Sequence, residues 1–383
     1  MTEETKDSVL QEDLDRVADD SVLQEALRGK RILVTGATGL VGSWLLRALA
    51  CMNRRAGSRM QLYGVIRNEE KARAIYGNEF MDREDVHFLR ADLSAADAGD
   101  TLLQALSEED GTTANLDIVI HGAAVTTSKT MVEKPVETIL TAIEGTHRML
   151  TLARQSGAKR FVYLSSMEMY GNLAAGTGEG SEPDTRADEN KLGYLDLMNV
   201  RTNYPESKRM CENLCIGFGQ EYGLDVMIAR LSQTFGAGIL PWEGRVFAQF
   251  ARSVMQGKDI VLHTRGLSEG NYCYTRDSVR GILTIAVKGT AGEAYNVSNE
   301  RTHTTIAGMA ELVAGKLAGG KIRVVYDIPE TNTYGYAADT RLFLDASKLR
   351  SLGWEPEVDL EEMYRRLISS MEFMDRQAGN SAV

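Results

Sequence analysis

Arg31-Ile-Leu-Val-Thr-Gly-Ala-Thr-Gly-Leu-Val-Gly-Ser-Trp-Leu-Leu-Arg-Ala-Leu-Ala50 is the stretch that decides the fold. Its first five residues are typical of a buried strand, and the apolar residues at its end recur at helical spacing. Between them, Gly36 and Gly39 allow the tight turn that brings backbone N–H groups and a helix N-terminus onto a pyrophosphate, and Gly42 permits close packing of helix on strand. The stretch therefore predicts a dinucleotide-binding turn.

The same alternation continues along the chain. Further short apolar runs, separated by amphipathic stretches, lie at 61–66, 86–89, 118–121, 160–165 and 225–231. Alternating strands and helices predict an α/β fold with a doubly wound parallel sheet of the Rossmann type. After residue 235 the segments become shorter and mixed, with helices expected at 246–255, 278–288 and 305–318 and strands at 260–263 and 323–326.

We therefore expect three parts. Residues 1–29 form an acidic helical N-terminal extension, 30–235 a dinucleotide-binding Rossmann domain, and 236–383 mainly a smaller discontinuous C-terminal substrate lobe, with some segments returning to the Rossmann domain. The lobe should lie at the carboxyl edge of the sheet, where ligands of such folds bind. The long acidic loop 171–203 is expected to be either a functional lid or disordered.

Composition excludes several classes of protein. The 383 residues contain 43 Lys and Arg against 54 Asp and Glu, a net charge of −11, which argues against a nucleic-acid partner. The most apolar stretch, 32–52, is interrupted by glycines and an arginine, so no membrane span is expected. An acidic start is unlike a signal peptide. The four cysteines lack zinc-site spacing, so we expect reduced thiols, no metal and a cytoplasmic location.

Two charged residues bear on the choice of dinucleotide. The strand 61–66 ends in Arg67, where an acid would hold the ribose hydroxyls of the adenosine. An arginine there can hold a 2′-phosphate by charge-assisted hydrogen bonds, which favours NADP weakly, or it can simply be solvated at a helix start. Asp92, after the run 86–89, is placed either to meet the adenine edge or to cap a turn.

A pair of residues for acid/base chemistry lies at Tyr204-Pro-Glu-Ser-Lys208. Because proline suits the first helical turn, Tyr204 and Lys208 should lie one turn apart on one helix face. We expect the ammonium to favour the phenolate and to lower the tyrosine pKa, so that Tyr204 acts on a substrate hydroxyl. The pair Ser165-Ser166, at the carboxyl end of the strand 160–165, would supply a hydroxyl that orients the same oxygen.

With these motifs in place, the chain from residue 30 to residue 375 resembles the extended short-chain dehydrogenase/reductases, in particular their nucleotide-sugar epimerase, dehydratase and decarboxylase group. The motifs that carry the resemblance are Thr35-Gly-Ala-Thr-Gly-Leu-Val-Gly42, His121-Gly-Ala-Ala124, Leu164-Ser-Ser-Met-Glu-Met-Tyr-Gly171, Tyr204-Pro-Glu-Ser-Lys-Arg209, Arg230-Leu-Ser-Gln-Thr-Phe-Gly236, Gly244-Arg-Val246, Tyr274-Thr-Arg-Asp277, Gly292-Glu-Ala-Tyr-Asn296 and Asp345-Ala-Ser-Lys-Leu349 with Leu352-Gly-Trp354.

The resemblance implies a tightly held NAD or NADP and a nucleotide-sugar substrate, whose C4 hydroxyl is oxidised to a 4-keto intermediate before the hydride returns. The catalytic residues that it implies are Tyr204, Lys208, Ser166 and Glu168. The cofactor would contact Gly36, Thr38, Gly39, Leu40, Gly42, Arg67, Asp92, Leu93, Ala123, Tyr204 and Lys208, and the substrate Ser128, Lys129, Arg201, Gln233 and Arg245.

Features within the resemblance favour different reactions. Asn199-Val-Arg201 and Gly244-Arg-Val246 are most similar to the UDP-glucuronate decarboxylase branch. However, Met167 stands where dehydratases have an acid, and Gly270 where decarboxylases and many epimerases have an arginine. Without a proton donor for elimination or a cation for a sugar carboxylate, we expect epimerisation through a 4-keto sugar, with Glu168 as base if an adjacent carbon is inverted.

The alternatives are a decarboxylase or 4,6-dehydratase, an NADPH-dependent ketoreductase and, in another class, a nicotinamide-binding sensor without turnover. A two-fold homodimer is also expected. Apolar helix faces at 102–106 and 208–218, which the resemblance places on an outer surface, are typical of such association.

Overall fold

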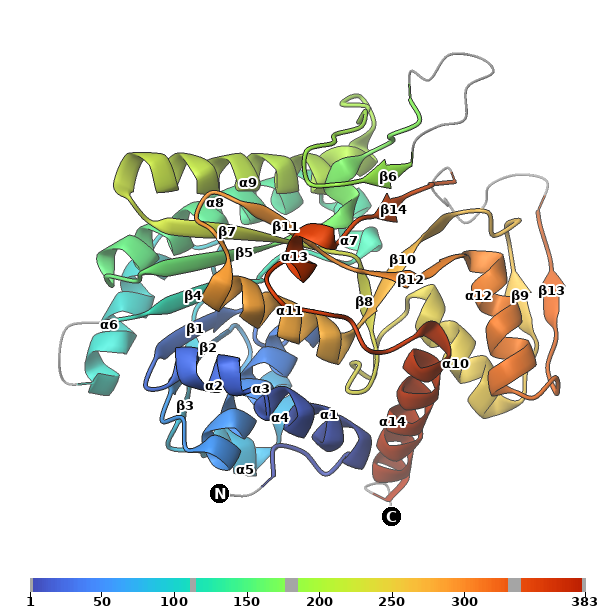
Figure 1. Cartoon of the computed structure of the whole chain (residues 1–383), viewed down its shortest axis with the longest axis horizontal. Helices are drawn as coiled ribbons and strands as arrows, with labels where there is room; N and C mark the ends of the chain where they lie inside the picture. Colours follow the sequence, from blue (N-terminus) through green and yellow to red (C-terminus); the bar gives the residue numbers. More distant parts are fainter. Residues whose placement is uncertain (1–2, 111–114, 176–184, 330–338, 381–383) are drawn as a thin grey trace.

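The computed structural model describes residues 3–110, 115–175, 185–329 and 339–380. Part of the loop expected as a lid, residues 176–184, therefore lies outside the described residues. Figure 1 shows a central sheet between two layers of helices, with a smaller lobe beside it and both chain ends on the same side of the molecule.

The central sheet has seven parallel strands in the order β11-β7-β5-β4-β1-β2-β3. They are β1 (Arg31–Thr35), β2 (Gln61–Ile66), β3 (Val86–Arg90), β4 (Ile118–His121), β5 (Arg160–Ser166), β7 (Asp225–Leu231) and β11 (Ala294–Val297). This confirms the parallel Rossmann sheet. Because the strand order reverses between β1 and β4, the crevice at their carboxyl ends is where such a fold places its ligand.

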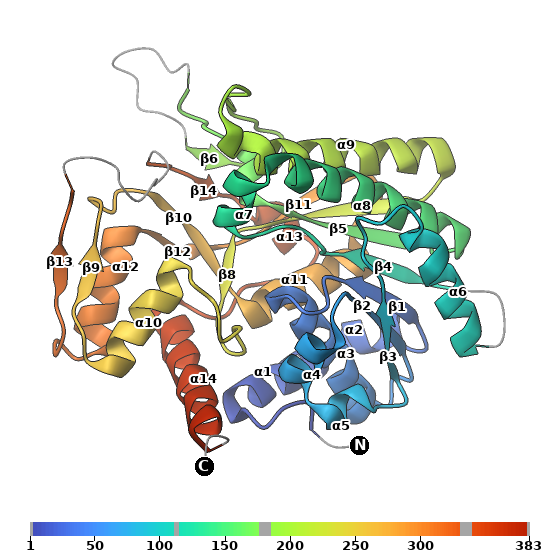
Figure 2. The ribbon, with the colours of Figure 1, turned by 180° about the vertical axis from the view of Figure 1, so that it is seen from behind.

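Alternate residues of each strand face different helix layers. Ile32 and Val34 of β1 lie in one buried cluster with α3 (Leu40–Ala56) and α11 (Thr275–Lys288), whereas Leu33 lies in a second cluster. The second cluster includes α6 (Ala98–Asp110), α8 (Pro135–Gln155) and α9 (Asn203–Tyr222). Both faces of the sheet are thus covered, as Figure 2 shows from the other side. Short helices α4 (Glu69–Tyr76), α5 (Asn78–Met81) and α7 (Ser128–Glu133) lie in the connections.

The faces that motivated the dimer turn inward. Leu102 and Leu106 of α6 are fully buried, and Cys211, Cys215 and Phe218 of α9 also lie in the core. The expectation that these faces lie outside is wrong, because they are the sides with which α6 and α9 cover the sheet. The large exposed apolar residues of α8 and α9 are Val136, Leu140, Met210 and Tyr222. The dimer stays a prediction.

The second lobe is built on a three-stranded sheet of β8 (Gln233–Phe235), β10 (Glu269–Tyr274) and β12 (Asn299–Thr305). Strands β9 (Ile260–Leu262) and β13 (Val324–Tyr326) pair, as do β6 (Arg186–Ala187) and β14 (Phe343–Leu344). Its helices are α10 (Val246–Gln256), α12 (Ile306–Leu312) and α14 (Leu360–Asn380), whereas α13 (Ser347–Arg350) packs against β11 of the central sheet. The helix expected at 305–318 is α12 followed by a π-helical turn, Val313–Leu317.

The N-terminal residues form α1 (Ser8–Ala18) and α2 (Ser21–Leu27). Each begins after an aspartate, Asp7 or Asp20, whose carboxylate accepts two backbone N–H bonds of the first turn. Helix α1 contacts α3, α11 and α14. None of the helices in the described part of the chain is long and apolar enough to cross a membrane.

Candidate active site

The glycine turn between β1 and α3 leaves no room for side chains at two positions. Gly36 has φ +72°, and a Cβ there would lie 2.9 Å from the backbone of Gly122. A Cβ on Gly42 would lie 2.2 Å from the carbonyl oxygen of Gly36. Helix α3 begins after Gly39 without a side-chain cap and without an acid in its first turn. Its first N–H groups therefore remain available to a pyrophosphate, so the turn fits a dinucleotide.

A buried hydrogen-bond network joins this turn to the neighbouring strand. The Thr35 hydroxyl accepts from the N–H groups of Gly122 and Ala123, both at 3.1 Å, and lies 2.7 Å from His121 Nδ1. Burial lowers the pKa of His121 to about 3, so its ring is neutral and Nδ1 can accept a hydrogen bond from the Thr35 hydroxyl. The network positions the backbone of Ala123 beside the glycine turn. Sequence reasoning missed it, although a polar residue ending an apolar strand was a signal.

Tyr76 is a second supporting residue that the sequence did not reveal. From the end of α4, its hydroxyl donates a 2.6 Å hydrogen bond to the carbonyl of Ala37 inside the glycine turn. The side chain is buried and stacks on Phe80. The conformation of the turn is thus held from the side of α4.

The adenosine end of the predicted site carries two cations. Arg67 is exposed. Hydrogen bonds from Ser94 lower the pKa of Asp92, and the charge of Arg67 adds to this effect. Burial lowers the pKa of Lys71, and the charge of Arg67 again adds to the shift. Asp92 accepts from the N–H and hydroxyl of Ser94, so it caps this turn. Leu93 is buried. The ammonium of Lys71 lies 5.1 Å from the ring centre of Trp242, which comes from the second lobe.

Ser166, Tyr204 and Lys208 meet at the carboxyl end of β5. Ser166 ends this strand, and Tyr204 and Lys208 lie on the first turns of α9, both buried. Lys208 Nζ donates to the carbonyl of Leu164 at 2.7 Å and lies 5.7 Å from the Tyr204 ring centre. Ser165 points elsewhere, since its hydroxyl donates to Glu212. The structure therefore leaves Ser166 as the site-facing serine.

The expected fall in the pKa of Tyr204 is wrong for this arrangement. Burial raises the pKa of Tyr204 well above 10, and the negative charge of Glu168 adds to this effect. A hydrogen bond with Ser166 lowers the pKa of Tyr204, and the charges of Arg245 and Arg201 lower it to a smaller extent. Burial also lowers the pKa of Lys208 to about 8. Tyr204 is consequently a neutral phenol that can donate a proton.

Glu168 lies on the 3₁₀ turn that follows β5, Met167–Tyr170. It is reached by solvent from the open side of the site but is otherwise surrounded by protein, and this burial raises its pKa. The charges of Arg201, Lys208 and Arg245 counteract the shift. The turn itself is supported below by a buried ion pair between Arg230 and Glu212, in which Arg230 also donates to the Tyr170 hydroxyl.

The predicted substrate residues are only partly brought together. Arg201 donates to the Ser128 hydroxyl at 3.1 Å, so these two side chains meet. Arg245 is held by an ion pair with Glu243, and its charge acts on Tyr204 and Glu168. Gln233 is partly buried in β8. Lys129 is turned to Glu133, with 81% of its side chain exposed.

The two departures from the family pattern are neighbours in space. A Cβ on Gly270 of β10 would lie 3.9 Å from the terminal methyl of Met167 and 3.7 Å from the carbonyl of Leu342. Within 4 Å of this Cβ position, the described residues place neither an acidic nor a cationic side chain.

Comparison with known proteins is consistent across sequence and structure. Residues 32–298 match the NAD dependent epimerase/dehydratase family. UDP-glucuronic acid decarboxylase 6 of Arabidopsis thaliana is 27% identical over 339 residues, covering 87% of this chain and 86% of the relative. The dTDP-D-glucose 4,6-dehydratase of Mus musculus is 23% identical over 352 residues, covering 88% of each chain.

Among solved structures, UDP-glucose 4-epimerase of Thermotoga maritima with UDP-glucose matches with a TM-score of 0.70 and 23% identity, over 90% of this chain and 99% of that one. This likeness is one of fold. The similar proteins thus include a decarboxylase, a dehydratase and an epimerase, which share a fold but differ in the reaction that they perform.

Proposed function

Since this chain belongs to the NAD-dependent epimerase/dehydratase family, we propose that it is a nucleotide-sugar epimerase working through a 4-keto intermediate. The observation that carries the proposal is the meeting of Ser166, Tyr204 and Lys208 at the carboxyl edge of the sheet, beside a place without charge at Met167 and Gly270. Ser166, Tyr204 and Lys208 are suited to alcohol oxidation and ketone reduction. Met167 and Gly270 lack the proton donor that elimination would need.

The residues of the chain divide the work. Held at the turn of Gly36, Gly39 and Gly42, NAD(P) would supply reversible hydride transfer at the sugar carbon. Oxidation of the hydroxyl requires the phenolate form of Tyr204, which takes the hydroxyl proton as the C–H bond breaks; the neutral phenol so formed returns this proton to the ketone oxygen as the C–H bond re-forms. Ser166 orients that oxygen, and its hydrogen bond together with the positive charges of Arg245 and Arg201 partly offsets the burial that raises the pKa of Tyr204. Glu168, with its raised pKa, can exchange a proton at a carbon next to the ketone.

A second candidate function is decarboxylation of a nucleotide-activated uronic acid. Arg201 favours it, because its positive charge acts on both Glu168 and Tyr204 and could hold a sugar carboxylate in place of the side chain missing at Gly270. The decarboxylase of Arabidopsis thaliana supports the same reading.

For the cofactor, we infer a preference for NADP over NAD. Arg67 and Lys71 lie close enough for the charge of Arg67 to lower the pKa of Lys71, after the effect of burial. Two neighbouring cations at the end of β2 suit a phosphate monoester, since each can donate charge-assisted hydrogen bonds to it.

The four cysteines are free and buried, which fits a reducing compartment such as the cytoplasm.

The test is turnover of UDP-, dTDP-, GDP- and CDP-sugars in D₂O, with products identified by mass spectrometry and NMR. Inversion at C4 gives an isomer without solvent deuterium, because the same hydride returns, whereas inversion next to the ketone introduces deuterium. The second route should be lost in Glu168→Gln, and both in Tyr204→Phe. Release of carbon dioxide from UDP-glucuronate would support the second candidate. A 4-keto-6-deoxy product, or stoichiometric oxidation of NADPH, would overturn both.

A further inference from the structure

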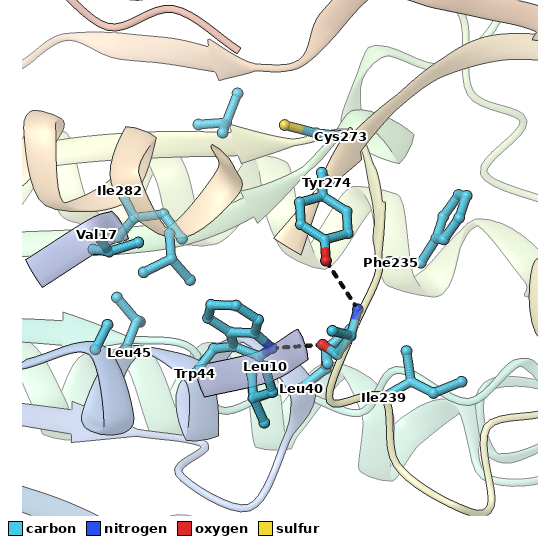
Figure 3. Close-up of a cluster of buried hydrophobic side chains, with 14 of the residues drawn as sticks. Leu10, Val17, Leu40, Trp44, Leu45, Phe235, Ile239, Cys273, Tyr274 and Ile282 are labelled. Atoms are coloured by element: carbon cyan, nitrogen blue, oxygen red, sulfur yellow. Dashed lines mark hydrogen bonds between the residues drawn. The ribbon is translucent and has the colours of Figure 1, made fainter. Parts of the chain in front are cut away.

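Helix α1 lies before the part of the chain that matches the family, yet one of its faces is buried against the rest of the molecule. Leu10, Leu14 and Val17 are at most 3% exposed, and the helix packs between α3, α11 and α14. Figure 3 shows Leu10 and Val17 in one cluster with Trp44 of α3, Tyr274 of β10 and Phe235 of β8. The helix thus touches both the Rossmann layer and the second lobe.

Asp13 of α1 carries a fully buried carboxylate with three partners. The Tyr274 hydroxyl donates to it at 2.5 Å, and Arg276 and Arg366 pair with it at 3.1 Å. A buried carboxylate is costly unless it is paired in this way. The partners come from β10, α11 and α14, so Asp13 joins three elements that lie far from it in the sequence.

Residues that contact α1 also form hydrogen bonds with the turn that follows β8. The Ala237 N–H lies 3.5 Å from the Tyr274 hydroxyl oxygen, and the Trp44 indole donates to the Ala237 carbonyl at 2.9 Å, as drawn in Figure 3. The N–H of Gly238 donates to Ser370 of α14 at 2.9 Å. The Ser370 hydroxyl in turn donates to Asp7, the N-cap of α1.

The turn at Gly238 also packs closely against Leu10 of α1. Gly238 has φ +75°, and a Cβ there would lie 3.0 Å from both Leu10 and the Trp44 indole nitrogen. The backbone at 237–238 is therefore held by hydrogen bonds on two sides and by apolar contact on a third. Both aspartates involved, Asp7 and Asp13, belong to the N-terminal segment.

From this turn the chain runs to the candidate site. We call residues 236–245 the substrate-side loop. Trp242 of this loop lies over Lys71 at the adenosine end, and Arg245 ends the loop with its charge acting on Tyr204 and Glu168. The loop thus faces both ends of the ligand site from the second lobe.

We propose that α1 is a positioning element of the active site, in which Asp13 and Asp7 hold the substrate-side loop so that Trp242 and Arg245 face the bound ligands. Neither aspartate touches substrate or cofactor. The consequence for sugar binding rests on the proposed function, but the consequence for the loop does not.

The loop can be followed directly by tryptophan fluorescence. The chain has three tryptophans, of which Trp44 and Trp354 are buried while Trp242 is 55% exposed. Acrylamide quenching therefore reports mainly on Trp242. Asp13→Asn keeps an acceptor for Tyr274 but removes the charge that pairs with both arginines. We expect its quenching constant to rise about twofold, because a released loop exposes the indole further.

Asp15→Asn is the matched control. Asp15 lies on the same helix but pairs with Arg54 and Arg55 of α3, away from the loop. Its quenching should equal that of the parent. In steady-state assays, Asp13→Asn should raise KM for the nucleotide sugar about tenfold with a smaller change in kcat, and leave NAD(P) affinity within about twofold.

If circular dichroism shows that Asp13→Asn does not fold, the double variant Tyr274→Phe, Ser370→Ala decides. It removes the two hydroxyls that link the loop to α1 and leaves the ion pairs of Asp13 with both arginines in place. Unchanged quenching in a folded variant overturns the proposal. If quenching increases in the variant while the parent protein turns over no nucleotide sugar, the positioning is supported and the proposed function is rejected.

Discussion

Replacing Gly42 by alanine tests whether the glycine turn is shaped for a dinucleotide. The new Cβ would lie 2.2 Å from the Gly36 carbonyl oxygen and 2.7 Å from its carbonyl carbon. Since ordinary contact begins near 3.4 Å, the turn or the start of α3 must move by about 1 Å. Overpacking of this kind costs about 1–3 kcal/mol, of which the higher helix propensity of alanine returns about 1 kcal/mol.

The same displacement moves the N–H groups that would hold the pyrophosphate. A hydrogen bond to a charged group contributes about 1.5–3 kcal/mol, so the loss of one should weaken NAD(P) binding at least about tenfold. Urea unfolding gives the stability change, and isothermal titration with NAD and NADP gives the affinity change.

The matched control is Gly217→Ala on α9, where an added Cβ meets nothing within 4 Å. It should stabilise the protein by about 0.5–1 kcal/mol and leave the cofactor affinity unchanged. A Gly42→Ala protein that binds the dinucleotide as tightly as the parent would refute the assignment of this turn.

Four further outcomes are expected. Tyr204→Phe should lower kcat at least about 10²-fold without loss of cofactor affinity, and activity within a fewfold of the parent would reject Tyr204 as the acid/base group. Arg67→Asp should reverse the preference for NADP in titrations, and an unchanged ratio of the two affinities would mean that Arg67 does not meet the cofactor. Burial lowers the pKa of Lys208 from 10.5 to about 8, so between these pH values the unfolded chain binds more protons than the folded protein. The free energy of unfolding should therefore rise with pH in this interval, relative to that of Lys208→Met. A fall would contradict the burial of the Lys208 ammonium. Light scattering should give the mass of a dimer, twice 42.2 kDa, and a monomer at micromolar concentration would count against it.

Local sequence was sufficient for the strands and for the glycine turn. The run at 31–35 is bounded as expected, and so are 61–66, 118–121 and 225–231, because burial on both faces of a parallel sheet leaves short apolar runs between polar or glycine-rich ends. The spacing of Tyr204 and Lys208 is likewise a local property, since it depends only on the geometry of one helical turn.

Other features depended on which residues surround a group. The inward faces of Leu102 and Leu106 follow from how α6 lies on the sheet, and the choice of Ser166 over Ser165 follows from the buried Glu212. The raised pKa of Tyr204 arises from the removal of water and from Glu168, neither of which helix spacing reveals.

The N-terminal segment shows most clearly which features follow from local sequence and which depend on tertiary packing. Its apolar period predicted helices, and the helices formed with aspartate caps, because capping and amphipathicity act within a few residues. That Asp13 would meet Tyr274, 261 residues away, was decided by tertiary packing alone. Periodicity specifies which face of a helix is buried, but the partners of a buried charge depend on long-range contacts that a local pattern does not encode.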